Sequence, residues 1–284
     1  MSPVNLSPTA KAALILPLGL LSATLIVILV QLLFGTLLGL PSFGALSPVV
    51  QEAAFLLFCF GILAAVALAG MALFGQRLPV SGRAAPDAAA GAGLGVAALG
   101  TAVALAMIAG ATVPGAGSET GVLLLSLGLV ITLVQAGAEE IFFRGWMQPA
   151  LQEGWGRWPG LLAASAAFSG LHFVVGEFDP LSLVNGFLAG LWFGLLLDRS
   201  GSILLPIGAH FGWNASEEML FGVAPNPGAG NFGTLFDWDL AGSPLWGGSE
   251  AGLNASLPAT FTLLALIAAT ASWGKRPSPS FRPG

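Results

Sequence analysis

The sequence predicts an all-α polytopic membrane protein with about eight transmembrane helices, formed by residues 1–284 as a single membrane domain. Only 8% of the residues are Asp, Glu, Lys or Arg, whereas a soluble domain carries about 25%. Hydrophobic residues make up 55% of the chain, and its mean hydropathy is +0.86. These values exclude a soluble enzyme and a disordered chain. Nine basic residues within a net charge of −5 exclude a basic face for nucleic acid, and a single cysteine excludes a disulfide framework.

The uncharged runs between the charged residues mark the predicted spans, because a helix needs about 17–25 apolar residues to cross the hydrocarbon core. These runs are 12–51, 53–76, 88–118, 120–138, 158–176, 180–197, 200–216 and 251–274. Gly39, Pro41 and Gly44 break the second half of the first run, so we expect one helix near 12–36 followed by a loop. The apolar core of a cleaved secretory signal would be only about 7–15 residues, so we expect this first helix to be retained.

The distribution of charge predicts the topology. With the N-terminus inside, no Lys or Arg falls on the outer side, which the positive-inside rule favours. The basic residues of the inner segments are Lys11, Arg77, Arg83, Arg157, Arg199, Lys275, Arg276 and Arg282. The outer loops hold the acidic residues Glu52, Glu119, Glu177, Asp179, Asp237, Asp239 and Glu250. We therefore expect a multi-pass integral membrane protein with both termini cytoplasmic. Residues 224–250 predict an irregular outer loop, and 274–284 a short, basic, disordered tail.

Charged residues at the end of the fourth span are the first functional candidates. Glu139, Glu140 and Arg144 surround the apolar residues 141–143. Each charge near the centre of a membrane costs about 2.5–3.5 kcal/mol, so these groups must reach water, neutralise one another or line a cavity. Glu140 and Arg144 have the i, i+4 spacing of a pair on one helical face. The alternative is that the helix ends at Ala138 and that these charges lie at the membrane surface.

The two histidines of the chain, His172 and His210, both fall within predicted spans. Asn214 follows His210 at i+4, and Glu217 follows at i+7, so the three side chains share one helical face. Phe168 precedes His172 at i−4, a spacing that aromatic packing alone would also explain. A single buried histidine is commonly a structural residue, but two with none at the surface indicate a functional site.

These residue types suit hydrolysis. Glu139, assisted by His172, would take a proton from a water molecule that attacks a peptide carbonyl. His210 and Asn214 would donate hydrogen bonds to the developing oxyanion. Alternatively, His172, His210 and Glu139 would hold a metal ion, with zinc as the expected metal, that activates the water. The residues leave both mechanisms open, and we favour the first because the ligand spacing is not diagnostic. HExxH and the P-loop motif are both missing from the sequence.

Three segments resemble the motifs of the CPBP intramembrane proteases, a family that includes the type 2 CAAX prenyl proteases and Abi-type bacteriocin-processing or immunity proteins. Residues 138–145 (AEEIFFRG) resemble the EExxxR motif, 168–172 (FSGLH) the FxxxH motif and 210–214 (HFGWN) the HxxxN motif. The resemblance covers a protease-like core of about 120–223, extending to about 273.

The resemblance implies an intramembrane endopeptidase that acts on a membrane-associated protein or peptide within the lipid bilayer. It implies that Glu139 and His172 activate water, that His210 and Asn214 stabilise the oxyanion, and that Glu140 and Arg144 are supporting residues. It leaves the need for a prenyl group and for a metal ion open. Two other functions compete with this one. Intramembrane charges also mark ion-coupled transporters, and an immunity or scaffold protein could share the fold without catalysis.

The depths of the candidate residues restrict the geometry. At about 1.5 Å per residue, Glu139 lies near the inner end of a fourth helix that begins at Thr120. His172 lies about 20 Å above the inner end of a fifth helix that begins near Trp158. A shared cavity therefore requires that the fourth helix begin later and continue past Glu140, or that the fifth be tilted or begin deeper. Residues 145–154, with two glycines and a proline, predict a break between the two helices.

Overall fold

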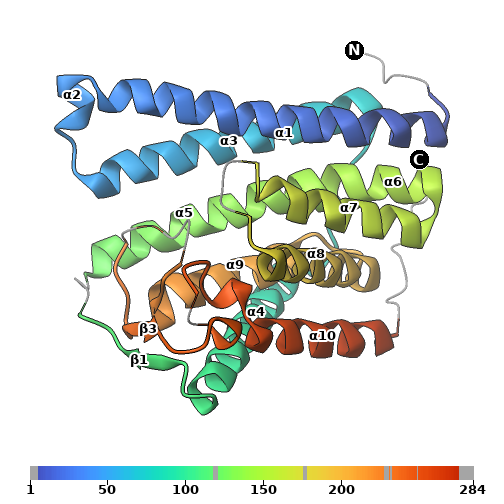
Figure 1. Ribbon diagram of the computed structural model, residues 1–284. Helices are drawn as coiled ribbons and strands as arrows, with labels where there is room; N and C mark the ends of the chain where they lie inside the picture. Colours follow the sequence, from blue (N-terminus) through green and yellow to red (C-terminus); the bar gives the residue numbers. More distant parts are fainter. Residues whose placement is uncertain are drawn as a thin grey trace.

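The computed structural model describes residues 6–117, 121–174, 178–226, 230, 232–247 and 249–274 (Figure 1). The α-helices are α1 (Pro8–Leu38), α2 (Pro41–Gly44), α3 (Pro48–Phe74), α4 (Ala84–Ile108), α5 (Val122–Glu140), α6 (Gln148–Trp155), α7 (Arg157–Leu171), α8 (Pro180–Ser200), α9 (Leu204–Ala215) and α10 (Leu257–Ser272). Two π-helical segments, η1 (Ile141–Met147) and η2 (Ser216–Phe221), and two 3₁₀ turns, η3 (Pro244–Trp246) and η4 (Leu253–Ala255), complete the helical structure. Glu119, Glu177, Lys275, Arg276, Arg282 and the tail after 274 lie outside the described residues.

One helix corresponds to each of the eight predicted spans, namely α1, α3, α4, α5, α7, α8, α9 and α10. In the described part of the chain, five helical stretches are long and apolar enough to cross a membrane: α1, α3, α4, the continuous stretch Val122–Trp155, and α8. The helices α7, α9 and α10 are shorter, with 15, 12 and 16 residues. The all-α membrane fold is confirmed, and the number of crossings stays a prediction.

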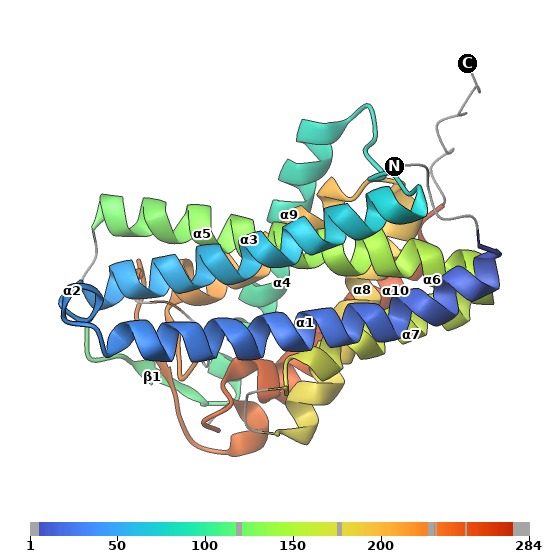
Figure 2. The same ribbon diagram turned by 90° about the horizontal axis from the view of Figure 1, so that it is seen from above.

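α1 and α3 run side by side in opposite directions, joined at α2 (Figures 1 and 2). The expected loop after the first helix is present but contains the short helix α2. The side-chain amide of Gln51 donates to the carbonyls of Phe43, Gly44 and Leu46, and these bonds join α3 to the turn around α2.

The fourth span does not end at Ala138. α5, η1 and α6 form one continuous helix, Val122–Trp155, so the chain begins this helix after Thr120 and continues it past Glu140. A fourth helix that begins later and continues past Glu140 is one of the two alternatives that would allow Glu139 and His172 to share a cavity. The expected break before the fifth helix is present but does not lie within 145–154. Gly145 lies inside η1, and Pro149 lies two residues after η1 within the continuous helix, where a local π-helical adjustment accommodates a proline. The chain turns at Gly156 instead, whose φ of +94° favours glycine.

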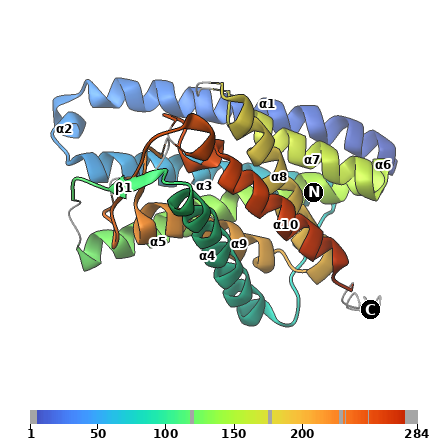
Figure 3. The same cartoon turned by 60° about the horizontal axis from the view of Figure 1, so that its bottom comes forward.

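α4 and α9 are in backbone contact through glycines. A Cβ atom at Gly95 on α4 would lie 2.6 Å from the backbone nitrogen of Trp213, and one at Gly208 on α9 would lie 2.8 Å from that of Ala92. Small residues of this kind allow membrane helices to approach closely. α10 lies against α4 and α8 (Figure 3). α4 thereby holds α9, the helix that carries His210 and Asn214.

Contacts between helix ends bring the predicted inner segments together. The Lys11 ammonium donates to the Phe74 carbonyl, the Ile203 N–H donates to the Pro79 carbonyl, and the Arg199 guanidinium donates to the Ala271 carbonyl. The beginning of α1 and the end of α10 therefore lie at the same end of the molecule (Figure 1). Which membrane face this end occupies stays a prediction.

A small sheet forms at the opposite end of the molecule. β3 (Trp238–Leu240) pairs antiparallel with β1 (Thr112–Pro114) and parallel with β2 (Val223–Ala224). Residues 224–250 are therefore not the wholly irregular loop that their glycine and proline content predicts. The β1–β3 pairing connects this loop to the end of α4, so it has a defined position over that end of the bundle.

Candidate active site

Glu139 and His172 line the same cavity, which has a volume of about 130 Å³. Glu139 lies in the last turn of α5 and is 7% exposed, while His172 directly follows α7 and is exposed. Glu139 Oε2 is buried and accepts no hydrogen bond from the described residues. The remaining walls are apolar: Ala23, Phe60, Leu63, Phe143 and Leu171. An imidazole and a buried carboxyl group, one oxygen of which lacks a hydrogen-bond partner among the described residues, therefore line the same cavity.

The histidine of this pair has a defined tautomer. His172 Nδ1 lies 2.8 Å from the Phe168 carbonyl oxygen. A carbonyl can only accept, so Nδ1 carries the hydrogen, and in the neutral ring Nε2 is the acceptor. The Phe168 ring also contacts the imidazole edge to face, with centroids 4.7 Å apart. Phe168, one helical turn before His172, thus fixes the imidazole through both a hydrogen bond and aromatic packing.

Glu140, Arg144 and His210 form a second, buried group. Arg144 Nη1 donates to Glu140 Oε1 at 3.0 Å, and His210 Nδ1 lies 3.0 Å from the same oxygen. Glu140 is 0% and Arg144 1% exposed, so the two charges neutralise each other inside the protein. Arg144 Nη2 also donates to the Gly190 carbonyl at 3.1 Å, which joins η1 to α8. The expected i, i+4 ion pair of Glu140 and Arg144 is therefore confirmed.

Phe168 separates the two histidines and contacts both. Its ring centroid lies 5.9 Å from that of His210, and the Arg144 guanidinium carbon lies 4.4 Å from its centroid. Phe193 of α8 stacks on His210, with centroids 4.9 Å apart and an interplanar angle of 20°. Phe193 could not be predicted as a site residue from the sequence, because one more phenylalanine in an apolar span carries no signal.

His210, Asn214 and Glu217, which were predicted to share one helical face, lie in different surroundings. Asn214 is half-buried, and its side chain makes no hydrogen bond to the described residues. Glu217, which is 3% exposed, accepts two bonds of 3.0 Å from Asn254, whose own Oδ1 accepts from Trp213 Nε1. Glu217 thus connects η2 to η4 and takes no part in the cavity of Glu139. The π-helical register that begins at Ser216 changes which face the residues after α9 occupy.

The expected metal ligands do not fit a metal site in this arrangement. Among the described residues, no three His, Cys, Asp or Glu side chains are placed to hold a metal ion together. His210 directs Nδ1 to Glu140 Oε1, whereas Glu139 and His172 face another cavity. We therefore derive no catalytic step through a metal.

The Ser169 side chain has a structural role, because it makes a hydrogen bond between two helices. Its hydroxyl donates to the Leu183 carbonyl at 2.6 Å, and the side chain is 1% exposed. Gly186 of α8 allows this approach, because a Cβ there would lie 2.9 Å from Ser169 Oγ. The hydroxyl thus joins α7 to α8.

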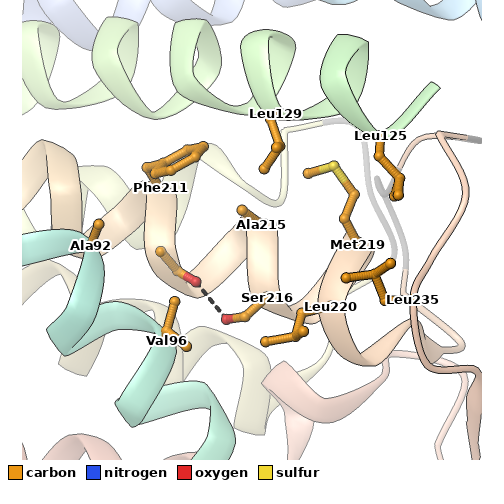
Figure 4. A pocket seen from close by; sticks show the side chains of 11 residues that line it. Ala92, Val96, Leu125, Leu129, Phe211, Ala215, Ser216, Met219, Leu220 and Leu235 are labelled. Atoms are coloured by element: carbon orange, nitrogen blue, oxygen red, sulfur yellow. Dashed lines mark hydrogen bonds between the residues drawn. The ribbon is translucent and has the colours of Figure 1, made fainter. Parts of the chain in front are cut away.

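A second cavity, of about 230 Å³, lies between α4, α5, α9 and η2 (Figure 4). Its walls are almost entirely apolar, with Leu129 of α5 facing Phe211 and Ala215 of α9. The Ser216 hydroxyl at its edge donates to the Gly212 carbonyl. None of the predicted catalytic side chains lines this cavity, which therefore does not belong to the candidate active site.

The comparison with known families agrees with the sequence motifs. Residues 121–216, about a third of the chain, match the family model described as type II CAAX prenyl endopeptidase, Rce1-like. No curated protein and no solved structure matches the chain. The matched segment contains Glu139, Glu140, Arg144, His172 and His210, and the match confirms that this chain resembles the CPBP family of intramembrane proteases.

Proposed function

We propose that this protein is an intramembrane endopeptidase that hydrolyses a peptide bond of a membrane-associated protein or peptide, with Glu139 and His172 as the water-activating residues. The observation that carries the proposal is the cavity that Glu139, whose buried Oε2 has no hydrogen-bond partner among the described residues, and His172 both line. The family match over 121–216 supports the same reaction.

In the proposed mechanism, Glu139 accepts a proton from a water molecule in the cavity while the water oxygen bonds to the peptide carbonyl carbon. The tetrahedral intermediate then breaks its C–N bond, and the proton passes from Glu139 to the leaving nitrogen. His172 holds the water through Nε2, which is the free acceptor when Nδ1 donates to the Phe168 carbonyl.

We assign the oxyanion to His210 and Asn214, which are one turn apart on α9, on the basis of the HxxxN motif, since neither side chain lines the cavity of Glu139 and His172. His210 Nδ1 is directed at Glu140, so Nε2 can donate to an oxyanion only when the ring carries both protons. Glu140 would accept a hydrogen bond from that imidazolium, while Arg144 donates to the same carboxylate oxygen and holds it in place. Arg144 and Glu140 thus support the reaction without contacting the substrate.

The test is a peptide-cleavage assay on protein purified in detergent. We expect Glu139→Gln and His172→Asn each to lower the cleavage rate about 10²–10⁴-fold, which is the usual contribution of general acid–base groups. The control is Glu153→Gln, the same substitution at an exposed residue of α6, which should leave the rate within about twofold. Cleavage by Glu139→Gln at the control rate would refute the proposal. Matched peptides with and without a prenyl group would show whether the lipid is required.

We also propose that both termini face the cytoplasm and that the working protein is embedded in lipid. The basic residues at the joined helix ends, Lys11 and Arg199 among them, support this orientation by the positive-inside rule. Protease protection of tags at the two ends in oriented vesicles tests the orientation. Accessible tags on the outer side would contradict it.

A further inference from the structure

The cavity of Glu139 and His172 is bounded by helices that precede the family-matched segment. Ala23 lies on α1, and Phe60 and Leu63 lie one turn apart on α3, whereas the family match begins at residue 121. Ala23 is 4% and Leu63 8% exposed, so both are fixed in the packed interior. The catalytic pair and the opposite wall of its cavity thus come from different parts of the chain.

The size and lining of the cavity limit what can occupy it. Its volume is about 130 Å³. An engineered apolar cavity of about 150 Å³ in another protein holds one benzene molecule. The cavity therefore has room for one branched or aromatic side chain but not for a whole isoprenoid chain. Apart from Glu139 and His172, its walls are hydrocarbon, which favours an apolar occupant.

We propose that Ala23, Phe60 and Leu63 form a specificity subsite that receives one apolar side chain of the substrate, of the size of leucine or phenylalanine, next to the scissile bond. This inference rests on the proposed peptidase function. The attacked carbonyl must lie within reach of Glu139, and the residue that bears it or follows it therefore directs its side chain into the same cavity. The sizes of these three side chains set the volume of the cavity, and this volume determines which substrate side chain fits.

The subsite makes opposite predictions for two substitutions. Leu63→Ala removes three carbons from the wall and enlarges the cavity, while Ala23→Leu adds three carbons and fills it. A hydrophobic pocket discriminates about 10–200-fold for a difference of one methylene, so a change of at least about tenfold is expected. Leu63→Ala should shift cleavage from leucine towards tryptophan substrates, and Ala23→Leu should shift it from leucine towards alanine substrates.

The experiment is internal competition between peptides. A defined peptide mixture is cleaved by the wild type in detergent, and mass spectrometry locates the scissile bond. Peptides that differ only in the two residues flanking that bond then compete in one reaction, and product ratios give the preference. The ratio does not depend on the fraction of folded enzyme, so partial unfolding of a variant does not obscure it. Should Leu63→Ala give no product, Leu63→Val must shift the ratio in the same direction.

Two matched controls carry the same substitutions on the same helices. Leu57→Ala changes a 43%-exposed residue of α3, and Ala13→Leu changes an exposed residue of α1. Both should keep the wild-type ratio within about twofold. Wild-type ratios in both Leu63→Ala and Ala23→Leu would overturn the subsite while leaving the peptidase function intact. No cleavage by the wild type would instead overturn the proposed function, and the subsite with it.

Discussion

Replacing Gly95 by alanine tests how α9 is held in position. The added Cβ atom would lie 2.6 Å from the backbone nitrogen of Trp213 and closer still to the carbonyl oxygen of Ala209. Both neighbours are backbone atoms of α9, so a side-chain rotation cannot relieve the overlap and the two helices must separate. Gly93 lies on the same helix, and a Cβ atom there would meet nothing within 4 Å. Gly93→Ala is therefore the matched control.

The magnitude follows from two terms. Overpacking a well-packed interface by one methyl group costs about 1–3 kcal/mol. Alanine stabilises a helix interior by about 0.5–1 kcal/mol relative to glycine, and this gain is common to both variants. We therefore expect Gly95→Ala to be about 1–3 kcal/mol less stable than Gly93→Ala. At about 2–4 °C per kcal/mol for proteins of roughly 150–250 residues, the two melting temperatures should differ by several degrees.

The protein provides its own probe for this measurement. Cys59 is the single cysteine of the chain and is 6% exposed, so a thiol-reactive fluorescent dye labels it on unfolding. We also expect Gly95→Ala to lower the rate of peptide cleavage, because a displacement of about 1 Å at reacting groups can cost about 10²-fold. A Gly95→Ala variant that melts at or above Gly93→Ala would refute the close contact between α4 and α9.

Three further substitutions test the polar contacts around the site. Arg144→Lys keeps the charge beside Glu140 but loses the planar pair of donors, so melting temperature and cleavage rate should both fall; unchanged values would show that charge alone suffices. Asn254→Leu leaves the buried carboxylate of Glu217 without its two hydrogen bonds and should cost about 1–3 kcal/mol in dye-monitored melting. A variant as stable as the wild type would contradict that contact. Ser169→Ala should cost about 1 kcal/mol but keep cleavage within about twofold, and complete loss of activity would instead indicate a serine nucleophile.

The sequence was sufficient to predict the helices because charges in a membrane chain are costly and therefore mark the ends of spans. Each uncharged run has its helix, and the i, i+4 pair of Glu140 and Arg144 is present. The same reasoning failed where charges are buried. Glu139 and Glu140 lie inside a continuous helix, because Arg144 and His210 compensate the second carboxylate. A rule that ends each span at the first charged residue cannot foresee that partners elsewhere in the chain will neutralise a buried carboxylate.

The candidate site was predicted only in part, because sequence motifs identify residues and not their neighbours. Glu139 and His172 do share a cavity. The pairing of His210 with Glu140 was not predicted, since 70 positions separate the two residues. Asn254 could have been noticed as an amide within the apolar run 251–274, but its partner Glu217 could not. Apolar cavity walls such as Phe60 carry no signal in a chain that is 55% hydrophobic.

The most direct test of the central claim is a double-mutant cycle on the cleavage rate. Wild type, Glu139→Gln, His172→Asn and the double variant are compared with one peptide in one detergent. Residues that act as a unit are strongly non-additive. The account predicts that the double variant is no slower than the slower single variant, within about threefold. Losses that multiply, or a single variant that retains the wild-type rate, would show that Glu139 and His172 do not act on the same water molecule.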